Sequence, residues 1–399
     1  MSGPLQGLKV VEFAHIMAGP VCGLMLADMG AEVIKVEKVP GGDDTRRMLP
    51  PSIGDESAAY LMMNRNKRGI ALDLKSPAGR DVAVSLIENG DVVIENYRKG
   101  TMDRLGLGYP QMRERNPGII YAELSGFGRS GPYADRAGFD LVAQGMSGLM
   151  SITGEGGSGP PIKCGAPVTD ITAGILAAMG VLGALFSRTH TQRGQRVDSS
   201  LFEAGIIHTY WQSAITMATG VAPGAMGSAH PLNAPYQAFQ TRDGWITVGA
   251  ANQANWLKLL DVIEATWMAQ DQRFETNIQR MQHLPELVKV LNGTFIQHDS
   301  SHWLERLEQA GVPAGPVLDI VQMHADPQAL ARGIVTQAPH ARLGEVATLG
   351  HPVQYSETPS SIRRGAPIYG EHTREVLAEH GYSKQQIESF LRDGVVIAA

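Results

Sequence analysis

The chain has 399 residues, 43% of them hydrophobic and 19% charged, a balance typical of a folded globular protein rather than a disordered one. Its length predicts about two domains, and a formal net charge of -6 disfavours nucleic acid as the main partner. There is no basic leader and no unbroken apolar run of membrane length, so we expect a cytoplasmic protein without a membrane partner. Cys22 and Cys164 form no CxxC pair, and we expect both to be small buried residues in a reducing compartment.

The first part of the chain alternates β-branched runs with helical patterns. Strands are predicted at 8–13, 32–37, 70–74, 91–97 and 118–124, and helices at 19–29 and 78–89. Strand–helix–strand units of this length predict an α/β fold, with a parallel sheet covered by helices on both faces.

Helices rich in glycine and alanine follow at 139–150 and 169–186, and this density of small residues favours close approach of backbones. The segment 193–199 is expected to lead into another helix. Residues 219–231 have the composition of a linker. Beyond it we predict a hairpin from 234–239 and 245–248, then helices near 253–263, 284–295 and 301–310. Two more helices are predicted in the tail, at 371–379 and 383–391.

Two segments match GxGxxG by letter, GFGRSG at 126–131 and GEGGSG at 154–159. Neither lies between a strand and a helix as a dinucleotide site requires, so ordinary glycine loops are favoured, although the second would suit a lid. No HExxH or other tight cluster of metal ligands occurs, and we expect no metal. His208, inside an apolar stretch, is expected to be a satisfied core histidine.

Two charged positions have alternative interpretations. Lys38 falls at the carboxyl end of a predicted strand, where open α/β sheets bind ligands, but solvated charge is the more ordinary reading. Asp170 precedes a run of small helix formers. It is either a helix-capping acid or a nucleophilic carboxylate whose pKa the helix N–H groups hold down.

Several long blocks resemble one family. The segment at 18–46 (AGPVCGLMLADMGAEVIKVEKVPGGDDTR) resembles the N-terminal signature of the class III CoA-transferases, also called the CaiB/BaiF family. Further similar blocks are NRNKRGIALDL at 64–74, ENYRKG at 95–100, SGFGRSGP at 125–132, GFDLVAQGMSG at 138–148, RGQRVDS at 193–199, GVPAGPV at 311–317 and GEHTREVL at 370–377. The resemblance covers almost the whole chain.

The resemblance implies an open, Rossmann-like α/β large domain formed by both chain ends, plus a smaller central α+β domain. We expect residues 1–200 in the large domain, 201–225 as a linker, 226–330 as the small domain, and 331–399 as a second linker and the return to the large domain. The family also implies an interlocked homodimer.

By the same resemblance, Asp170 matches the catalytic aspartate and Lys38 the cation that holds the phosphate end of CoA. The other positions that match CoA-binding stretches are Met17, Ala18, Leu72, Asp73, Leu74, Lys75, Asn96, Tyr97, Arg98, Arg104, Ala137, Gly138, Phe139 and Asp140. Some relatives carry a basic residue at the position of Ala137, so that one contact is absent here. CoA and acyl-CoA are implied as substrates, with no tightly bound cofactor.

The implied reaction moves CoA between carboxylic acids through an aspartyl-CoA thioester on Asp170. Two other functions stay open. Racemases of this fold exchange an α-proton with a histidine at the position of Phe139, which has no proton to exchange. A non-catalytic acyl-CoA binding protein would use Asp170 only as a helix cap.

Substrate choice is weakly encoded. The oxalate and formyl branch has a run of glycines where this chain has MGSAHPLNAPYQAF at 226–239, which favours the branch that transfers CoA from succinyl-CoA to dicarboxylates. Arg46, Arg47 and His230 are candidate cations for a second carboxylate, with solvated charge as an equal interpretation.

Overall fold

The computed structural model describes residues 3–156 and 159–399, which form two compact units. The large unit contains residues 1–148, 164–208 and 327–399, and the small unit contains 149–163 and 209–326. Both chain ends therefore build the large unit. The boundaries differ from the expected ones. Residues 149–163 belong to the small unit and 327–330 to the large one, and the segment expected to be a linker is divided, with 201–208 in the large unit and 209–225 in the small unit.

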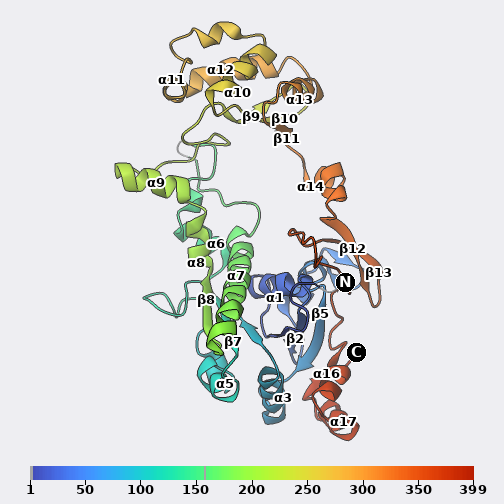
Figure 1. Ribbon diagram of the computed structural model, residues 1–399. Coiled ribbons are helices and arrows are strands. Elements are labelled where there is room, and N and C mark those ends of the chain that lie inside the picture. Colours follow the sequence, from blue (N-terminus) through green and yellow to red (C-terminus); the bar gives the residue numbers. More distant parts are fainter. Residues whose placement is uncertain (1–2, 157–158) are drawn as a thin grey trace. The chain divides into compact units, whose positions relative to one another are not determined.

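A seven-stranded sheet forms the centre of the large unit (Figure 1). Its strands run in the order β14-β5-β2-β1-β6-β7-β8, and all neighbours are parallel except β14, which pairs with β5 in the antiparallel sense. Strand order reverses between β1 and β6, as in doubly wound dinucleotide-binding folds. In chain order the strands are β1 (Lys9–Glu12), β2 (Glu32–Lys38), β5 (Lys67–Leu72), β6 (Val92–Glu95), β7 (Ile120–Ser125), β8 (Arg196–Ser200) and β14 (Val396–Ile397).

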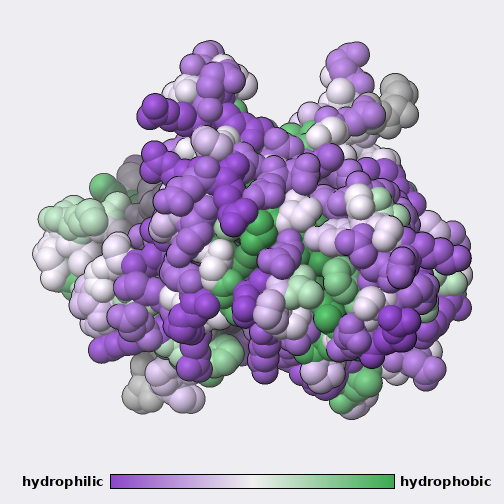
Figure 2. Space-filling model, turned by 90° about the horizontal axis from the view of Figure 1, so that it is seen from below, coloured by the Kyte–Doolittle hydropathy of each residue, from purple (hydrophilic) through white to green (hydrophobic). Residues whose placement is uncertain are grey.

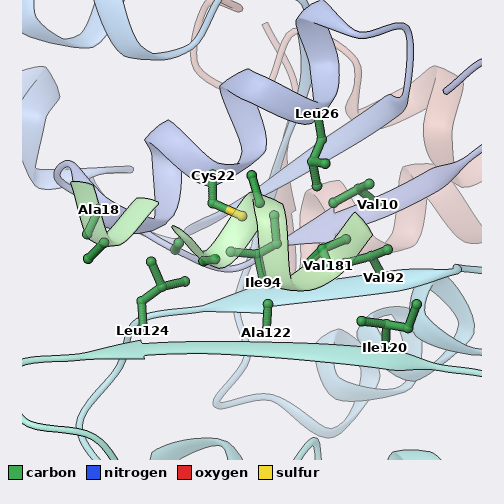
Figure 3. Packing of buried hydrophobic residues seen from close by; sticks show 14 of the residues in the cluster. Val10, Ala18, Cys22, Leu26, Val92, Ile94, Ile120, Ala122, Leu124 and Val181 are labelled. Carbon is green, nitrogen blue, oxygen red and sulfur yellow. The ribbon is translucent and has the colours of Figure 1, made fainter. Parts of the chain in front are cut away.

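Helices cover both faces of this sheet. On one face, α3 (Pro77–Glu88), α5 (Tyr109–Arg115), α16 (Thr373–Glu379) and α17 (Lys384–Arg392) share a hydrophobic core with the strands. On the other face, α1 (Ala18–Asp28) and α7 (Val168–Thr191) pack over β1, β6 and β7. Figure 3 shows side chains of α1 and α7, among them Cys22, Leu26 and Val181, pointing toward Val92, Ile94 and Ala122 of the strands.

Helix α7 approaches α1 closely because small residues line their contact. A methyl group added at Gly174 of α7 would lie 2.6 Å from the carbonyl oxygen of Ala18 and 2.8 Å from Val21. By length and composition alone α7 is also long and apolar enough to cross a membrane. Its buried residues, however, belong to the core shared with α1 and the strands.

The remaining elements of the large unit are short. They are η1 (Asp44–Arg47), β3 (Ser52–Ile53), β4 (Glu56–Ser57), α2 (Ala58–Met63), α4 (Thr101–Arg104), α6 (Asp140–Met146), α8 (Leu201–Ile207), α15 (Pro327–Ala331), β12 (Val335–His340) and β13 (Gly344–Leu349). The face seen from below is mostly hydrophilic, with separate hydrophobic patches near its centre and a few more at its edges (Figure 2).

The small unit is an α+β body with a core of its own, centred on Trp256, Phe239 and Phe295. Its antiparallel sheet has the order β11-β10-β9. Its elements are η2 (Leu149–Ser151), α9 (Tyr210–Thr219), β9 (Tyr236–Gln240), β10 (Trp245–Gly249), α10 (Gln253–Val262), η3 (Thr266–Ala269), α11 (Asn277–Gln282), α12 (Leu284–Phe295), α13 (Ser300–Gln309), β11 (Ala314–Pro316) and α14 (Ile320–His324).

Three local expectations need correction. The segment at 193–199 leads into a helix as expected, α8, but 196–200 also form β8, a mostly polar strand at the edge of the sheet that was not predicted. The β12–β13 hairpin lies in a stretch for which no strand was predicted. Cys22 is buried as expected, whereas Cys164 is exposed.

The contact between α1 and α7 gives a matched test. We predict that Gly174→Ala destabilises the protein, because the cost of overpacking, about 1–3 kcal/mol, exceeds the gain in helix propensity of up to about 1 kcal/mol. Gly183→Ala on the same helix meets no atom within 4 Å and should stabilise the protein instead. Thermal unfolding of both variants measures this. A fall in Tm for both, or for neither, would contradict the close packing at Gly174.

Candidate active site

A cavity of about 470 Å³ lies at the carboxyl ends of β1, β6 and β7, beside the point where strand order reverses. Ligands bind at this position in open α/β sheets. The loops after these strands and the first turn of α7 line it. The lining residues are His15, Ile16, Met17, Ala18, Asp44, Asn96, Tyr97, Arg98, Lys99, Thr101, Leu124, Ser125, Gly126, Arg129, Ala134, Asp135, Arg136, Ala137, Gly138, Phe139, Asp170 and Leu201.

Asp170 lies in the first turn of α7 and faces this cavity. Its carboxylate makes no hydrogen bond to any residue that the structure describes. Burial, and next the negative charge of Asp140, raise the pKa of Asp170 to about 6. The expectation that helix N–H groups hold this pKa down is therefore wrong, because burial and a like charge outweigh the helix terminus. At neutral pH the group is still mostly ionised.

Asp140 performs the capping role that the sequence suggested for Asp170. Its Oδ1 accepts hydrogen bonds from the backbone N–H of Thr169 at 3.0 Å and from the Thr169 hydroxyl at 2.7 Å. Its Oδ2 accepts one from Gln144 at 2.8 Å. Asp140 thus fixes the start of α7 and places a second negative charge near Asp170.

Asn96 holds the loop after β1 against the loop after β6. Its Oδ1 accepts from the His15 N–H at 3.0 Å, and its Nδ2 donates to the His15 carbonyl at 2.7 Å. Burial lowers the pKa of His15, although the charges of Asp43 and Asp44 oppose this effect. The imidazole, which contacts the Tyr97 ring, is therefore neutral at pH 7.

A buried ion pair holds the backbone of Tyr97. Glu95 accepts from the Tyr97 N–H at 2.7 Å, and Arg129 donates to the Tyr97 carbonyl at 3.0 Å. Glu95 and Arg129 also pair with each other. Burial raises the pKa of Glu95 to about 7 despite this pairing. The neighbouring side chains of Asn96 and Arg98 are thereby presented from a fixed main chain.

The first glycine segment belongs to the cavity wall. A methyl group added at Gly126 would lie 2.5 Å from the Cα of Gly138, so the two loops approach too closely for any side chain. GFGRSG is therefore no dinucleotide motif, but Gly126 and Arg129 from it line the cavity. In the second segment, residues 157 and 158 lie outside the described residues, and the remainder belongs to the small unit.

Many of the residues expected to bind CoA come together here. Those that line the cavity with Asp170 are Met17, Ala18, Asn96, Tyr97, Arg98, Ala137, Gly138 and Phe139.

Other expected CoA contacts lie outside the cavity lining. Lys38, at the end of β2, donates to Asp44 at 2.6 Å, and Asp44 is a lining residue. Leu72 is the last residue of β5, where its side chain is buried in the core, and Asp73 to Lys75 follow the strand at the same edge of the sheet. Arg104 is exposed and bonds to Thr101, while Asp140 lies behind Asp170 as its helix cap.

The three candidate substrate cations are placed differently. Arg46 donates twice to Glu37, both at 2.7 Å, and packs over the Tyr60 ring, so it is a structural residue of the loop after β2. Arg47 is exposed and pairs with Asp44. His230 belongs to the small unit, where it contacts Trp211 and Tyr236.

Sequence reasoning missed His15, Arg129 and Arg136 as lining residues. Arg129 and Arg136 follow the strand β7, so the rule that ligands bind at strand ends would have found them. His208 is satisfied by a hydrogen bond to Thr172 at 2.8 Å, but it is exposed and not part of the core. Across 3–156 and 159–399, no three His, Cys, Asp or Glu side chains gather as metal ligands.

Comparison with known proteins gives consistent results. The family model for CoA-transferase family III matches residues 5–373. Succinyl-CoA:glutarate CoA-transferase of Homo sapiens is 36% identical over 98% of this chain and 90% of its own length. Succinate--glutarate CoA-transferase of Agrobacterium fabrum is 38% identical over 94% of this chain and 95% of its own.

Among solved structures, a CaiB/BaiF family protein from Brucella suis is 37% identical and superimposes with a TM-score of 0.85, over 95% of this chain and 100% of that one. Sequence and fold agree over nearly the whole length. The chain therefore belongs to CoA-transferase family III.

Proposed function

We propose that this enzyme transfers CoA from succinyl-CoA to a second dicarboxylate, and that Asp170 carries the acyl group and then CoA. The main support for this proposal is the position of Asp170, whose carboxylate faces the cavity and accepts no hydrogen bond from any described residue. A carboxylate without donors is a better nucleophile than one held by several hydrogen bonds. Its pKa of about 6 keeps it ionised at neutral pH while strengthening it relative to an ordinary aspartate.

The chemistry balances without any other reactant. A carboxylate oxygen of Asp170 attacks the acyl carbon of the donor, the C–S bond breaks, and CoA leaves as a thiolate. The thiolate then attacks the aspartyl carbon of the mixed anhydride and releases the donor acid, leaving an aspartyl-CoA thioester. The acceptor carboxylate reverses both steps and restores Asp170. One thioester forms for each one broken, and no net proton is exchanged.

The cationic side chains that line the cavity also favour anionic substrates. Arg98, Lys99 and Arg136 line it, while Arg129 is engaged by Glu95. Lys99 pairs with Asp135, so Arg98 and Arg136 are the cations best suited to the phosphates of CoA and the distal carboxylate of a diacid. Two relatives are named for succinate or succinyl-CoA and glutarate, which supports the same class of acid. Phe139, at the racemase histidine position, offers no proton for the alternative reaction.

The substrate class can be tested with acids of matched length. With succinyl-CoA as donor, we predict that glutarate exceeds valerate in kcat/KM by about tenfold to a hundredfold, the value of one charge-assisted hydrogen bond to the distal carboxylate. Steady-state assays with both acids measure this. Equal or faster turnover of the monocarboxylate would overturn the dicarboxylate assignment.

The acid limb of the pH profile tests the role of Asp170. Activity should fall as pH drops through about 6, because protonation removes the nucleophile. We predict that Asp140→Asn moves this limb to lower pH, since it removes the second cause of the raised pKa and leaves burial in place.

Asp135→Asn is the matched control, because Asp135 also lines the cavity but is mostly exposed and pairs with Lys99. It should leave the limb in place. Asp170→Asn should reduce turnover about a thousandfold or more. If the acid limb does not move in Asp140→Asn, a group other than Asp170 must cause the loss of activity at low pH. Glu95, with a pKa of about 7, is then the next candidate.

A further inference from the structure

The loop after β1 contains a strained residue at the cavity. Ile16 has a φ of +67°, in the left-handed region that a β-branched side chain rarely adopts. It lies between His15 and Met17, and all three line the cavity. Such a conformation persists only where the surroundings enforce it.

Asp43 is the side chain that holds this residue. Its Oδ1 accepts the Ile16 N–H at 3.1 Å, together with the N–H of Thr45 at 2.9 Å and its hydroxyl at 2.8 Å. Asp43 itself is only 3% exposed, so this carboxylate acts inside the protein and is not a surface contact.

Lys35 of β2 forms a buried ion pair with Asp43 and fixes its position. Its Nζ lies 2.8 Å from Oδ2 of Asp43 and donates to the carbonyl of Ala14 at 2.9 Å. Lys35 also pairs with Glu12 of β1 at 3.0 Å. Burial opposes the charge of Asp43, but the charge of Lys35 and the hydrogen bonds from Lys35, Thr45 and Ile16 hold its pKa well below the usual range. The pair therefore stays ionised at every assay pH.

The turn at Ile16 directly precedes the start of α1. Met17 is its N-cap residue and provides no side-chain cap, and the main-chain N–H groups of Met17 and Ala18 belong to residues that line the cavity. The direction in which these groups point depends on the turn at Ile16.

We propose that Asp43, anchored by Lys35, is a positioning residue for acyl-CoA: it enforces the left-handed turn at Ile16 and so aims the main chain of Met17 and Ala18 at the ligand. This inference rests on the proposed acyl-CoA site in this cavity. The ion pair of Asp43 and Lys35 would thus act in CoA binding although neither side chain lines the cavity.

The test is a rescue experiment. Asp43→Asn should weaken CoA binding about tenfold or more in calorimetry, and lower kcat/KM for succinyl-CoA to match. Glycine adopts positive φ freely, so Ile16→Gly combined with Asp43→Asn should restore most of the loss. Ile16→Ala in the same background removes nearly as much side chain but keeps the penalty, and should not rescue.

Two further variants separate positioning from stability. Thr45→Val removes a hydrogen bond to the same carboxylate without touching the 14–18 segment, so it should lower Tm while the Kd for CoA stays within about twofold of wild type. Asp43→Glu keeps the charge beside Lys35 but displaces the acceptor from Ile16. It should therefore weaken CoA binding, with rescue by glycine at 16, even if Asp43→Asn fails to fold.

Equal rescue by alanine and glycine, no rescue by either, or unchanged CoA affinity in both Asp43 variants would each overturn the inference. These readings do not require Asp170, because CoA affinity is measured without turnover. Retained transfer activity in Asp170→Asn would instead refute the proposed nucleophile and leave the Asp43 result standing.

Discussion

Asp140 holds the first turn of α7 by accepting two hydrogen bonds from Thr169, and its negative charge is, after burial, the second cause of the raised pKa of Asp170. A single carboxylate thus anchors the helix that carries the proposed nucleophile and raises the pKa of that nucleophile through its charge. The small residues of α7 bring this helix against α1, whose own start forms another wall of the same cavity. The close packing of α7 against α1 therefore also fixes the positions of the two helix starts that line the cavity.

Buried ionisable side chains recur in the central strands and in the loops that follow them. Lys35 and Asp43 hold the loop after β1, and Glu95 with Arg129 holds the loop after β6. Burying such pairs is costly, and hydrophobic residues of similar size often stabilise a fold better. Their placement beneath loops that line the cavity indicates that these charges fix loop conformation. The buried ion pairs therefore lower the stability of the fold but preorganise the main chain of these loops for ligand binding.

The sequence predicted the α/β class and most elements of the sheet because its buried parallel strands are short apolar runs between helices. It did not reveal β8, whose residues are mostly polar at the sheet edge. The capping pattern at Asp170 was correctly recognised as a helix start, but the cap comes from Asp140, far away in sequence. The direction of its pKa shift depends on burial and a distant charge, which no local pattern contains. Arg46 shows the same limit, since its partner Glu37 is visible only in the fold. The homodimer and the cytoplasmic location stay predictions.

Oxygen exchange into Asp170 tests the covalent role most directly. An acceptor acid labelled with 18O in its carboxylate is turned over with succinyl-CoA in unlabelled water, and the peptide that contains Asp170 is then analysed by mass spectrometry. The bridging oxygen of the second anhydride comes from the acceptor and stays on the aspartate when CoA thiolate attacks the acceptor carbon. The account predicts 18O in the side chain of Asp170. An unlabelled peptide after many turnovers would show that CoA passes between the acids without Asp170.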